Sequence, residues 1–298
     1  MSIDVHSDEM LYLVDADAQV ESLGTGCQFT EGPVWNSKHG FLLFSDIPAN
    51  QMKKWSSETG IVDFREPSGK SNGLTYDRQG RLIACEHANR RVSRTEVDGE
   101  IVTIASHFDG KRLNSPNDVV VKTDGSIYFT DPPYGLTAEY GTQGEKELDF
   151  QGVYRLPPDE TGLALLVDDF DCPNGLCFSP DESVLYINDS SERMHVRAFD
   201  VQPDGAVANG RVFAEIVGEG GVPDGMKTDR EGNVYVTGPG GVWIFDVSGK
   251  HLGIIKTPEG ATNLAWGESD WKTLYIVAKT SLYRIKCKVA GVPVFFEL

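Results

Sequence analysis

Six short motifs recur along this chain, and their repetition constrains the fold more than any other feature. The motifs are Glu31-Gly32-Pro33, Asn72-Gly73-Leu74, Asn117-Asp118-Val119, Asn174-Gly175-Leu176, Asp224-Gly225-Met226 and Asn263-Leu264-Ala265. They are 39 to 57 residues apart, the length of a four-stranded propeller blade with variable loops. One such motif alone indicates a turn. Six in register, each followed by a strand-like run such as Ser126–Thr130, predict an all-β six-bladed β-propeller around a central channel.

The same pattern predicts one propeller domain over residues 1–298. No stretch carries a helical period with caps, and 32 glycines indicate many tight turns. The N-terminal segment around Gln19–Leu23 is expected to complete the last blade beside the C-terminal strands.

Charge and cysteine content exclude several classes of protein. The formal net charge is −18, which argues against a nucleic-acid partner because phosphate binding needs clustered Lys and Arg. No apolar run is long enough to span a bilayer, and Met1–Met10 lacks the apolar core of a signal peptide. The five cysteines are odd in number and form no C-x-x-C pair, which favours a reducing compartment. We therefore expect a cytoplasmic protein with no membrane partner.

Propeller geometry gives the motif residues a common location. The innermost strand of each blade lines the channel, so the first residues of the motifs meet at one mouth. These residues are Glu31, Asn72, Asn117, Asn174, Asp224 and Asn263. Carboxylates crowded there need compensation, and their oxygens with amide oxygens suit a divalent cation. Calcium is the first choice, with magnesium, manganese and zinc as alternatives. The pattern alone is equally compatible with a catalytic metal and with a structural ion that plugs the channel.

A second ring of polar residues is predicted around the first, because the second strand of each blade returns to the same face. Its members are Asp46, Glu86–His87, Asp131 and Asp189. Substrate contacts are therefore expected from Asn72, His87 and Asp131. For His87, a proton shuttle to the leaving hydroxyl and a supporting hydrogen bond are equally compatible with the sequence.

The motifs resemble those of the gluconolactonase/regucalcin (senescence marker protein) family. The matching runs are Phe29-Thr30-Glu31-Gly32-Pro33-Val34-Trp35, Asn114-Ser115-Pro116-Asn117-Asp118, Phe129-Thr130-Asp131-Pro132-Pro133-Tyr134-Gly135, Pro173-Asn174-Gly175-Leu176 and Pro223-Asp224-Gly225. The run Ala84-Cys85-Glu86-His87 is similar to the bacterial-type gluconolactonase branch. The resemblance implies a six-bladed propeller that hydrolyses a small-molecule sugar lactone with a divalent metal.

The resemblance also implies roles for individual residues. The metal ligands fall on Glu31, Asn174 and Asp224, and Asp224 would also be the general base. Asn117 matches a metal-site residue of the related diisopropyl fluorophosphatase and a substrate contact in the regucalcin branch.

Two features depart from this pattern or extend it. Where the regucalcin branch has a substrate-binding Arg, this chain has Ser115, and Arg112 is the nearest candidate to replace it. The long loop from Pro132 to Gln151 carries Tyr134 and Tyr140, which would contact substrate if the loop is a lid; an ordinary surface insertion is equally compatible.

The sequence also bears on functions other than a lactonase. Gly69-Lys70-Ser71-Asn72-Gly73 has the G-x-S-x-G spacing, but a nucleophile elbow needs a helix after the serine and here a strand is expected. A phosphotriesterase or aryl esterase of the diisopropyl fluorophosphatase type and a non-catalytic calcium-binding propeller are the remaining alternatives. The sequence selects neither a particular lactone nor an oligomeric state.

Overall fold

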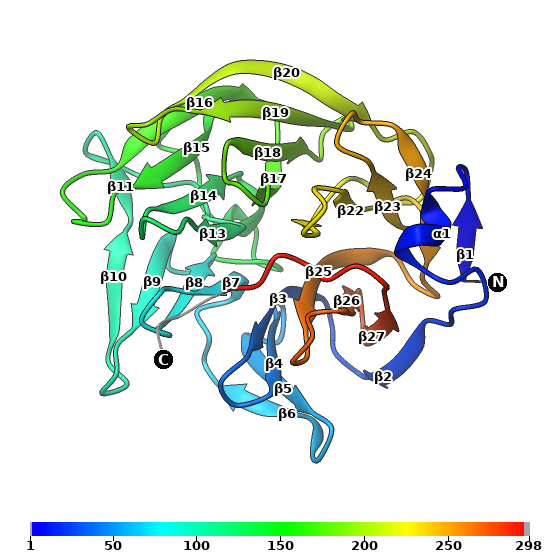
Figure 1. The fold of residues 1–298 in the computed structure, drawn as a ribbon. Coiled ribbons are helices and arrows are strands. Elements are labelled where there is room, and N and C mark those ends of the chain that lie inside the picture. Colours follow the sequence, from blue (N-terminus) through cyan, green and yellow to red (C-terminus); the bar gives the residue numbers. More distant parts are fainter. Residues whose placement is uncertain (1, 295–298) are drawn as a thin grey trace.

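The computed structural model describes residues 2–294, which form six four-stranded antiparallel sheets arranged in a ring, as Figure 1 shows. The predicted six-bladed β-propeller is confirmed. Within residues 2–294 no helix has the length and apolar character needed to cross a bilayer. The strands of the blades, from the channel outward, are as follows.

Blade one holds β3 (Thr30–Asn36), β4 (Phe41–Asp46), β5 (Gln51–Ser56) and β6 (Gly60–Arg65). Blade two holds β7 (Ser71–Tyr76), β8 (Leu82–Glu86), β9 (Arg91–Thr95) and β10 (Ile101–Ala105). Blade three holds β13 (Val119–Val121), β14 (Ile127–Asp131), β15 (Gln151–Leu156) and β16 (Ala164–Phe170). Blade four holds β17 (Pro173–Phe178), β18 (Val184–Asp189), β19 (His195–Val201) and β20 (Val207–Glu215). Blade five holds β21 (Met226–Thr228), β22 (Val234–Gly238), β23 (Gly241–Phe245) and β24 (His251–Lys256). Blade six holds β25 (Ala261–Gly267), β26 (Thr273–Ala278), β27 (Ser281–Lys286) and β2 (Glu21–Thr25).

The N-terminal strand closes the ring. Strand β2 pairs antiparallel with β27, with Glu21 opposite Arg284. This is the closure predicted for the segment around Gln19–Leu23, and it covers an edge that would otherwise be free to pair with another chain.

Some small elements were not predicted. Strand β1 (Ile3–Val5) adds a fifth strand to blade five beside β24, and the short helix α1 (Met10–Leu13) buries Met10 and Leu13 against the cluster between blades five and six. A two-stranded hairpin, β11 (His107–Phe108) and β12 (Lys111–Arg112), stands outside the blades. A 3-10 turn, η1 (Tyr134–Leu136), begins the long loop of blade three.

The core is divided among the blade interfaces. Six buried hydrophobic clusters each join the residues of two neighbouring blades. Between blades six and one, for example, Trp35 stacks on Tyr275 with ring centroids 5.4 Å apart. Because these faces hold the blades in a fixed ring, the inner strands present their ends at two defined mouths of one channel.

Candidate metal and lactone site at the proximal mouth

The proximal mouth lies where the inner strands begin, and the motif residues gather there as predicted. Glu31, Asn72 and Asn174 are each the second residue of β3, β7 and β17. Asn117 and Asp224 lie two residues before β13 and β21, and Asn263 is the third residue of β25.

Amide side chains link one arc of this ring. The Nδ2 of Asn72 donates to Oδ1 of Asn117 at 2.8 Å. The Nδ2 of Asn117 in turn donates to Oδ1 of Asn174 at 2.6 Å. These bonds orient the amide of Asn117 so that its oxygen faces Asn72. The arc thus fixes Asn174 from one side.

Two carboxylates complete the other arc. Glu31 Oε2 accepts from Nδ2 of Asn263 at 2.9 Å and from the backbone N of Gly32 at 2.8 Å. The carboxyl of Asp224 interacts with the side chains of both Glu31 and Asn174. Glu31, Asn174 and Asp224 therefore converge on one another.

The electrostatics of this pair are unfavourable without a counter-charge. Burial raises the pKa of Asp224 well above its ordinary value, and the neighbouring charge of Glu31 raises it further. Burial likewise raises the pKa of Glu31. Asp224 is only partly buried as a residue, but its carboxyl turns inward toward Glu31. Two carboxyls held this closely retain a proton unless a cation replaces it.

The glycine after a motif residue is required by the approach of the next blade. A Cβ on Gly175 would lie 2.1 Å from the carbonyl oxygen of Asp224, and one on Gly73 would lie 2.6 Å from that of Asn117. A side chain at either position would push the following ring residue away. The dipeptides that indicate turns in isolation are thus points of close contact between strands.

The carboxylates of the predicted second ring lie at the ends of the second strands of their blades, at Asp46, Glu86, Asp131 and Asp189. Asp131 is fully buried, and its Oδ2 accepts from the backbone N of Asn114 at 2.7 Å. Asp46 and Asp189 accept in the same way from the segments that precede their own inner strands. Glu86 is held by Arg91, at 2.7 Å, and by Ser93. Asp46, Asp131 and Asp189 thus hold backbone behind the ring, whereas Glu86 binds side chains. These contacts favour a structural role for Asp131 over the expected substrate contact.

His87 is also buried behind the ring, at 1% exposure. Its Nδ1 lies 3.1 Å from the carbonyl oxygen of Tyr140, and its Nε2 lies 3.2 Å from Oδ1 of Asn117. Its Nε2 also lies 3.4 Å from Nδ2 of Asn72, so both ring nitrogens have polar partners in the protein. Burial lowers the pKa of His87 to about 4. A neutral ring whose two nitrogens both contact protein groups favours the supporting role over the proton shuttle.

The two remaining predicted residues lie in different places. Arg112, on β12 of the separate two-stranded hairpin, donates to the carbonyl of Asn89 at 2.9 Å, so the structure does not bring it to the ring. Tyr134, on η1, is half-buried; its hydroxyl interacts with Ser190 and Cys172, and its pKa is raised by burial and by nearby charges that include Asp224.

The loop that carries Tyr134 crosses the proximal mouth. Lys70 donates to the carbonyls of Ala138 and Glu139 at 2.6 and 2.8 Å. The ring of Tyr140 packs edge-on against Phe29 of blade one. The loop is thus bound to blades one, two and four, as a lid over the site would be.

Sequence reasoning missed two charged residues behind the ring. Asp118 is buried, and its Oδ2 has no hydrogen-bond partner within residues 2–294. Burial raises the pKa of Asp118, while the positive charge of Lys227, on β21, opposes that rise. Asp118 follows Asn117 directly in its motif, which was the available signal; nothing around Lys227 distinguished it.

The residues at the proximal mouth fit a divalent cation. All the converging donors are oxygens, two are carboxylates with raised pKa values, and Oδ1 of Asn72 is buried without a partner among the described residues. Within residues 2–294 no three His, Cys, Asp or Glu side chains form a metal cluster. A site here would therefore depend on amide oxygens as well as on Glu31 and Asp224.

Comparison with known proteins identifies the family. Residues 29–280 match the SMP-30/Gluconolactonase/LRE-like region, and the chain belongs to this family. A gluconolactonase from Zymomonas mobilis is 33% identical over 94% of this chain and 84% of its own length. A pentonolactonase from Haloferax volcanii is 29% identical over 85% of this chain and 82% of its own.

Solved structures agree with this assignment. The structure of a gluconolactonase from Xanthomonas campestris superimposes with a TM-score of 0.90 at 34% identity, covering 96% of this chain and 95% of that one. A calcium-binding regucalcin from Agrobacterium tumefaciens superimposes with a TM-score of 0.77 at 17% identity, covering 94% and 98%. At that identity the second match supports the fold alone.

Proposed function

We propose that this protein is a divalent-metal-dependent lactonase that opens a sugar lactone at the proximal mouth. The observation that carries the proposal is the convergence of Glu31, Asn174 and Asp224 on one point of the channel, with both carboxyls at raised pKa. The similarity to gluconolactonases and a pentonolactonase supports the choice of substrate class.

Glu31, Asn174 and Asp224 would hold the cation. Asn117 takes an orienting role in this proposal, because its oxygen accepts from Asn72 while its nitrogen donates to Asn174. When bound, a divalent cation supplies Lewis acidity that polarises a lactone carbonyl and lowers the pKa of water.

The chain's own groups provide the rest of the chemistry. Asp224 is the most exposed of the three ligands, so we assign it as the base that accepts a proton from the attacking water. The charge of Asp224 acts on the hydroxyl of Tyr134, and in this proposal that hydroxyl would donate a hydrogen bond to a hydroxyl of the sugar. The loop from Pro132 to Gln151 would exclude bulk water from the reacting groups.

The substrate range is tested with a pH-indicator assay on glucono-, galactono- and xylono-lactone. Metal-stripped protein is assayed alone and after addition of calcium, magnesium, manganese or zinc. The proposal predicts metal-dependent acid release well above spontaneous hydrolysis for at least one of the lactones. Rates equal to spontaneous hydrolysis with every lactone and metal would overturn the proposal.

The assigned residues are tested by isosteric substitution. Glu31→Gln and Asp224→Asn should fold like the wild type and lose at least 100-fold in kcat/KM, because each removes a carboxylate that contributes several kcal/mol to the transition state. Asp46→Asn is the matched control, since Asp46 is a buried carboxylate of blade one that accepts from the backbone N–H groups of Gln28 and Phe29. Wild-type activity in either ligand variant would refute the assignment.

A further inference from the structure

The distal mouth of the channel, where the inner strands end, holds a cavity of about 190 Å³. It lies at the opposite end of the inner strands from Glu31 and Asp224, and its walls are largely aromatic and aliphatic. They include Trp35, Tyr76, Val121, Phe178, Trp266 and Val292. An apolar cavity of about 150 Å³ accommodates benzene, so this space suits one six-membered ring.

The C-terminal segment forms one wall of this cavity. The backbone N of Val292 donates to the carbonyl of Thr228 at 3.1 Å, and that of Gly291 to the carbonyl of Trp271 at 2.8 Å. The segment is therefore fastened to blades five and six, and Val292 faces the cavity from a fixed position.

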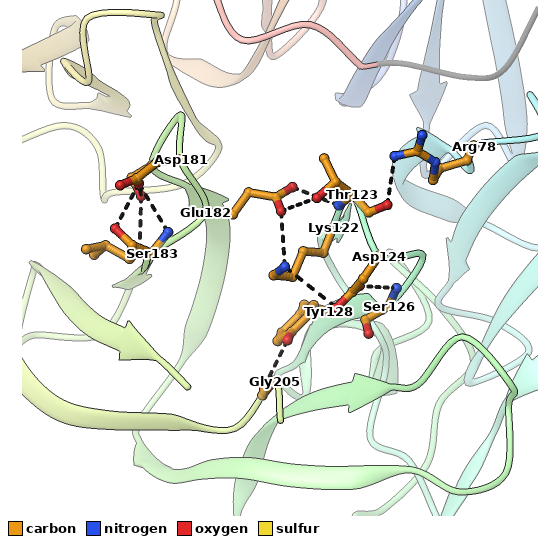
Figure 2. Close-up of polar contacts among 12 residues, drawn as sticks. Arg78, Lys122, Thr123, Asp124, Ser126, Tyr128, Asp181, Glu182, Ser183 and Gly205 are labelled. Atoms are coloured by element: carbon orange, nitrogen blue, oxygen red, sulfur yellow. Dashed lines mark hydrogen bonds and ion pairs between the residues drawn. The ribbon is translucent and has the colours of Figure 1, made fainter. Parts of the chain in front are cut away.

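Side-chain contacts between blades hold the rim of the cavity rigid, as Figure 2 shows. Arg78 of blade two donates to the carbonyl of Thr123 at 2.7 Å. Glu182 of blade four accepts from the backbone N of Thr123 at 2.8 Å and pairs with Lys122 at 3.1 Å. The carboxylate of Glu182 is thus already paired with Lys122 and bonded to Thr123. The β7–β8, β13–β14 and β17–β18 turns, which carry these residues, form a rim that exists before any ligand binds.

The charge of the cavity is opposite to that of the molecule. Arg78, Lys122 and Lys227 line it, against the single carboxylate of Glu182, whereas the whole chain carries −18. Lys227 is half-buried, and the one hydrogen bond of its ammonium group is to the carbonyl of Met226, at 2.9 Å. Within residues 2–294 it has no ion pair with a carboxylate, although its charge acts on the buried Asp118. An ammonium group has three donors to satisfy.

We propose that the distal cavity binds a small amphipathic carboxylate, with a ring or short hydrocarbon body of about six carbons. The carboxylate would bind Lys227, and the hydrocarbon body would lie between Phe178 and Trp266. Polyhydroxylated acids such as aldonates do not fit, because the apolar walls leave their hydroxyls without partners. This site is separate from the proximal mouth and does not depend on the lactonase proposal.

Benzoate is the probe that tests this site, with benzyl alcohol as its neutral counterpart and gluconate as its polar counterpart. Calorimetric titration of the full-length protein should give saturable binding of one benzoate per chain. Binding of benzyl alcohol and of gluconate should be at least tenfold weaker. No saturable binding of benzoate, or equal binding of benzyl alcohol, would overturn the proposal.

Two variants locate the binding. Lys227→Met should weaken benzoate binding at least tenfold, whereas Lys250→Met, an exposed lysine of the same blade, should stay within twofold of the wild type. Val292→Trp should fill the cavity and abolish binding, with Val247→Trp at an exposed position as its control. Unchanged affinity in both cavity variants would contradict the proposal.

A crystal soaked with 4-bromobenzoate gives a result that does not depend on the folding of any variant. The anomalous signal of bromine is expected between Phe178 and Trp266. Bromine found only at the proximal mouth or on the outer surface would refute the distal site.

Discussion

The ring residues act as a set because each fixes the next. Asn72, Asn117 and Asn174 form a chain of amide hydrogen bonds, and Asn263 holds Glu31 from the other side. The position of Asp224 depends on the backbone packed behind it, where Gly175 leaves no space for a side chain.

Substitution of Gly175 therefore tests the geometry of the site from outside it. Gly175→Ala places a methyl group 2.1 Å from the carbonyl oxygen of Asp224. We expect a loss of roughly 1–3 kcal/mol in the free energy of unfolding, as for other overpacked cores, and at least a tenfold loss of lactonase activity. Chemical denaturation and the lactone assay measure the two effects.

Gly162→Ala is the control for this change, because a Cβ at Gly162 has no heavy atom within 4 Å. Similar stability and activity in the two alanine variants would show that the close approach at Gly175 is not needed.

Asp131 predicts a pH dependence of stability. Burial raises the pKa of Asp131 from its ordinary 3.8 to about 7, so the fold favours its neutral form. The stability that the neutral form of Asp131 gives the fold is fully present below about pH 4 and is lost as the pH rises through about 7. The side chain of Asn in Asp131→Asn is neutral at every pH, so at this position the variant does not lose stability as the pH rises through about 7. The free energy of unfolding of the variant minus that of the wild type should increase between pH 4 and 7, by at most roughly 4 kcal/mol. A difference that is constant with pH, in denaturation curves over that range, would contradict the shift.

At the scale of elements, the loop from Pro132 to Gln151 joins β14 to β15 and contacts neighbouring blades beside the ring residues. Lys70 binds two successive carbonyls of this loop, Ala138 and Glu139. Lys70→Met keeps the length of the side chain and removes the donor. We expect KM for the lactone to rise several-fold with kcat changed less than twofold, and hydrogen exchange of residues 134–142 to accelerate.

Lys38→Met is the control, since Lys38 lies in the exposed turn between β3 and β4. Unchanged exchange and unchanged KM in Lys70→Met would mean that this lysine does not hold the loop.

The sequence predicted the blades well because the motif recurs and the strands behind it are short and mostly rich in β-branched and aromatic residues. The predicted run Ser126–Thr130 corresponds to β14 at Ile127–Asp131, and the predicted closing segment Gln19–Leu23 to β2 at Glu21–Thr25. The elements it missed, β1 and α1, have three and four residues, too few to show a period. Their place is decided by packing on blade five.

Of the candidate site, the sequence predicted the location of the inner-ring residues, but not the contacts of the residues around them. Repetition places Glu31 and Asp224 at one mouth, because both begin a motif. It does not reveal which way a side chain at a strand end turns. Asp131 and His87 turn toward backbone groups, and those partners come from distant segments, Asn114 and Tyr140.

At the scale of the whole molecule, the ring concentrates negative charge at one mouth and positive charge at the other. Glu31, Asp118 and Asp224 gather toward the proximal mouth, and Arg78, Lys122 and Lys227 line the distal one. The two sites that we propose therefore take ligands of opposite charge, a cation at the first mouth and an anion at the second.

We propose that the cation bound by Glu31, Asn174 and Asp224 makes the propeller a lactonase. The most direct test of this proposal is a calcium titration of metal-stripped protein, followed at once by calorimetry and by acid release from glucono-lactone. We predict that activity rises in proportion to one bound calcium per chain, and that Glu31→Gln loses both signals while Asp46→Asn keeps them. Full lactonase activity in the stripped protein, or calcium binding that leaves the rate at its spontaneous value, would contradict the account.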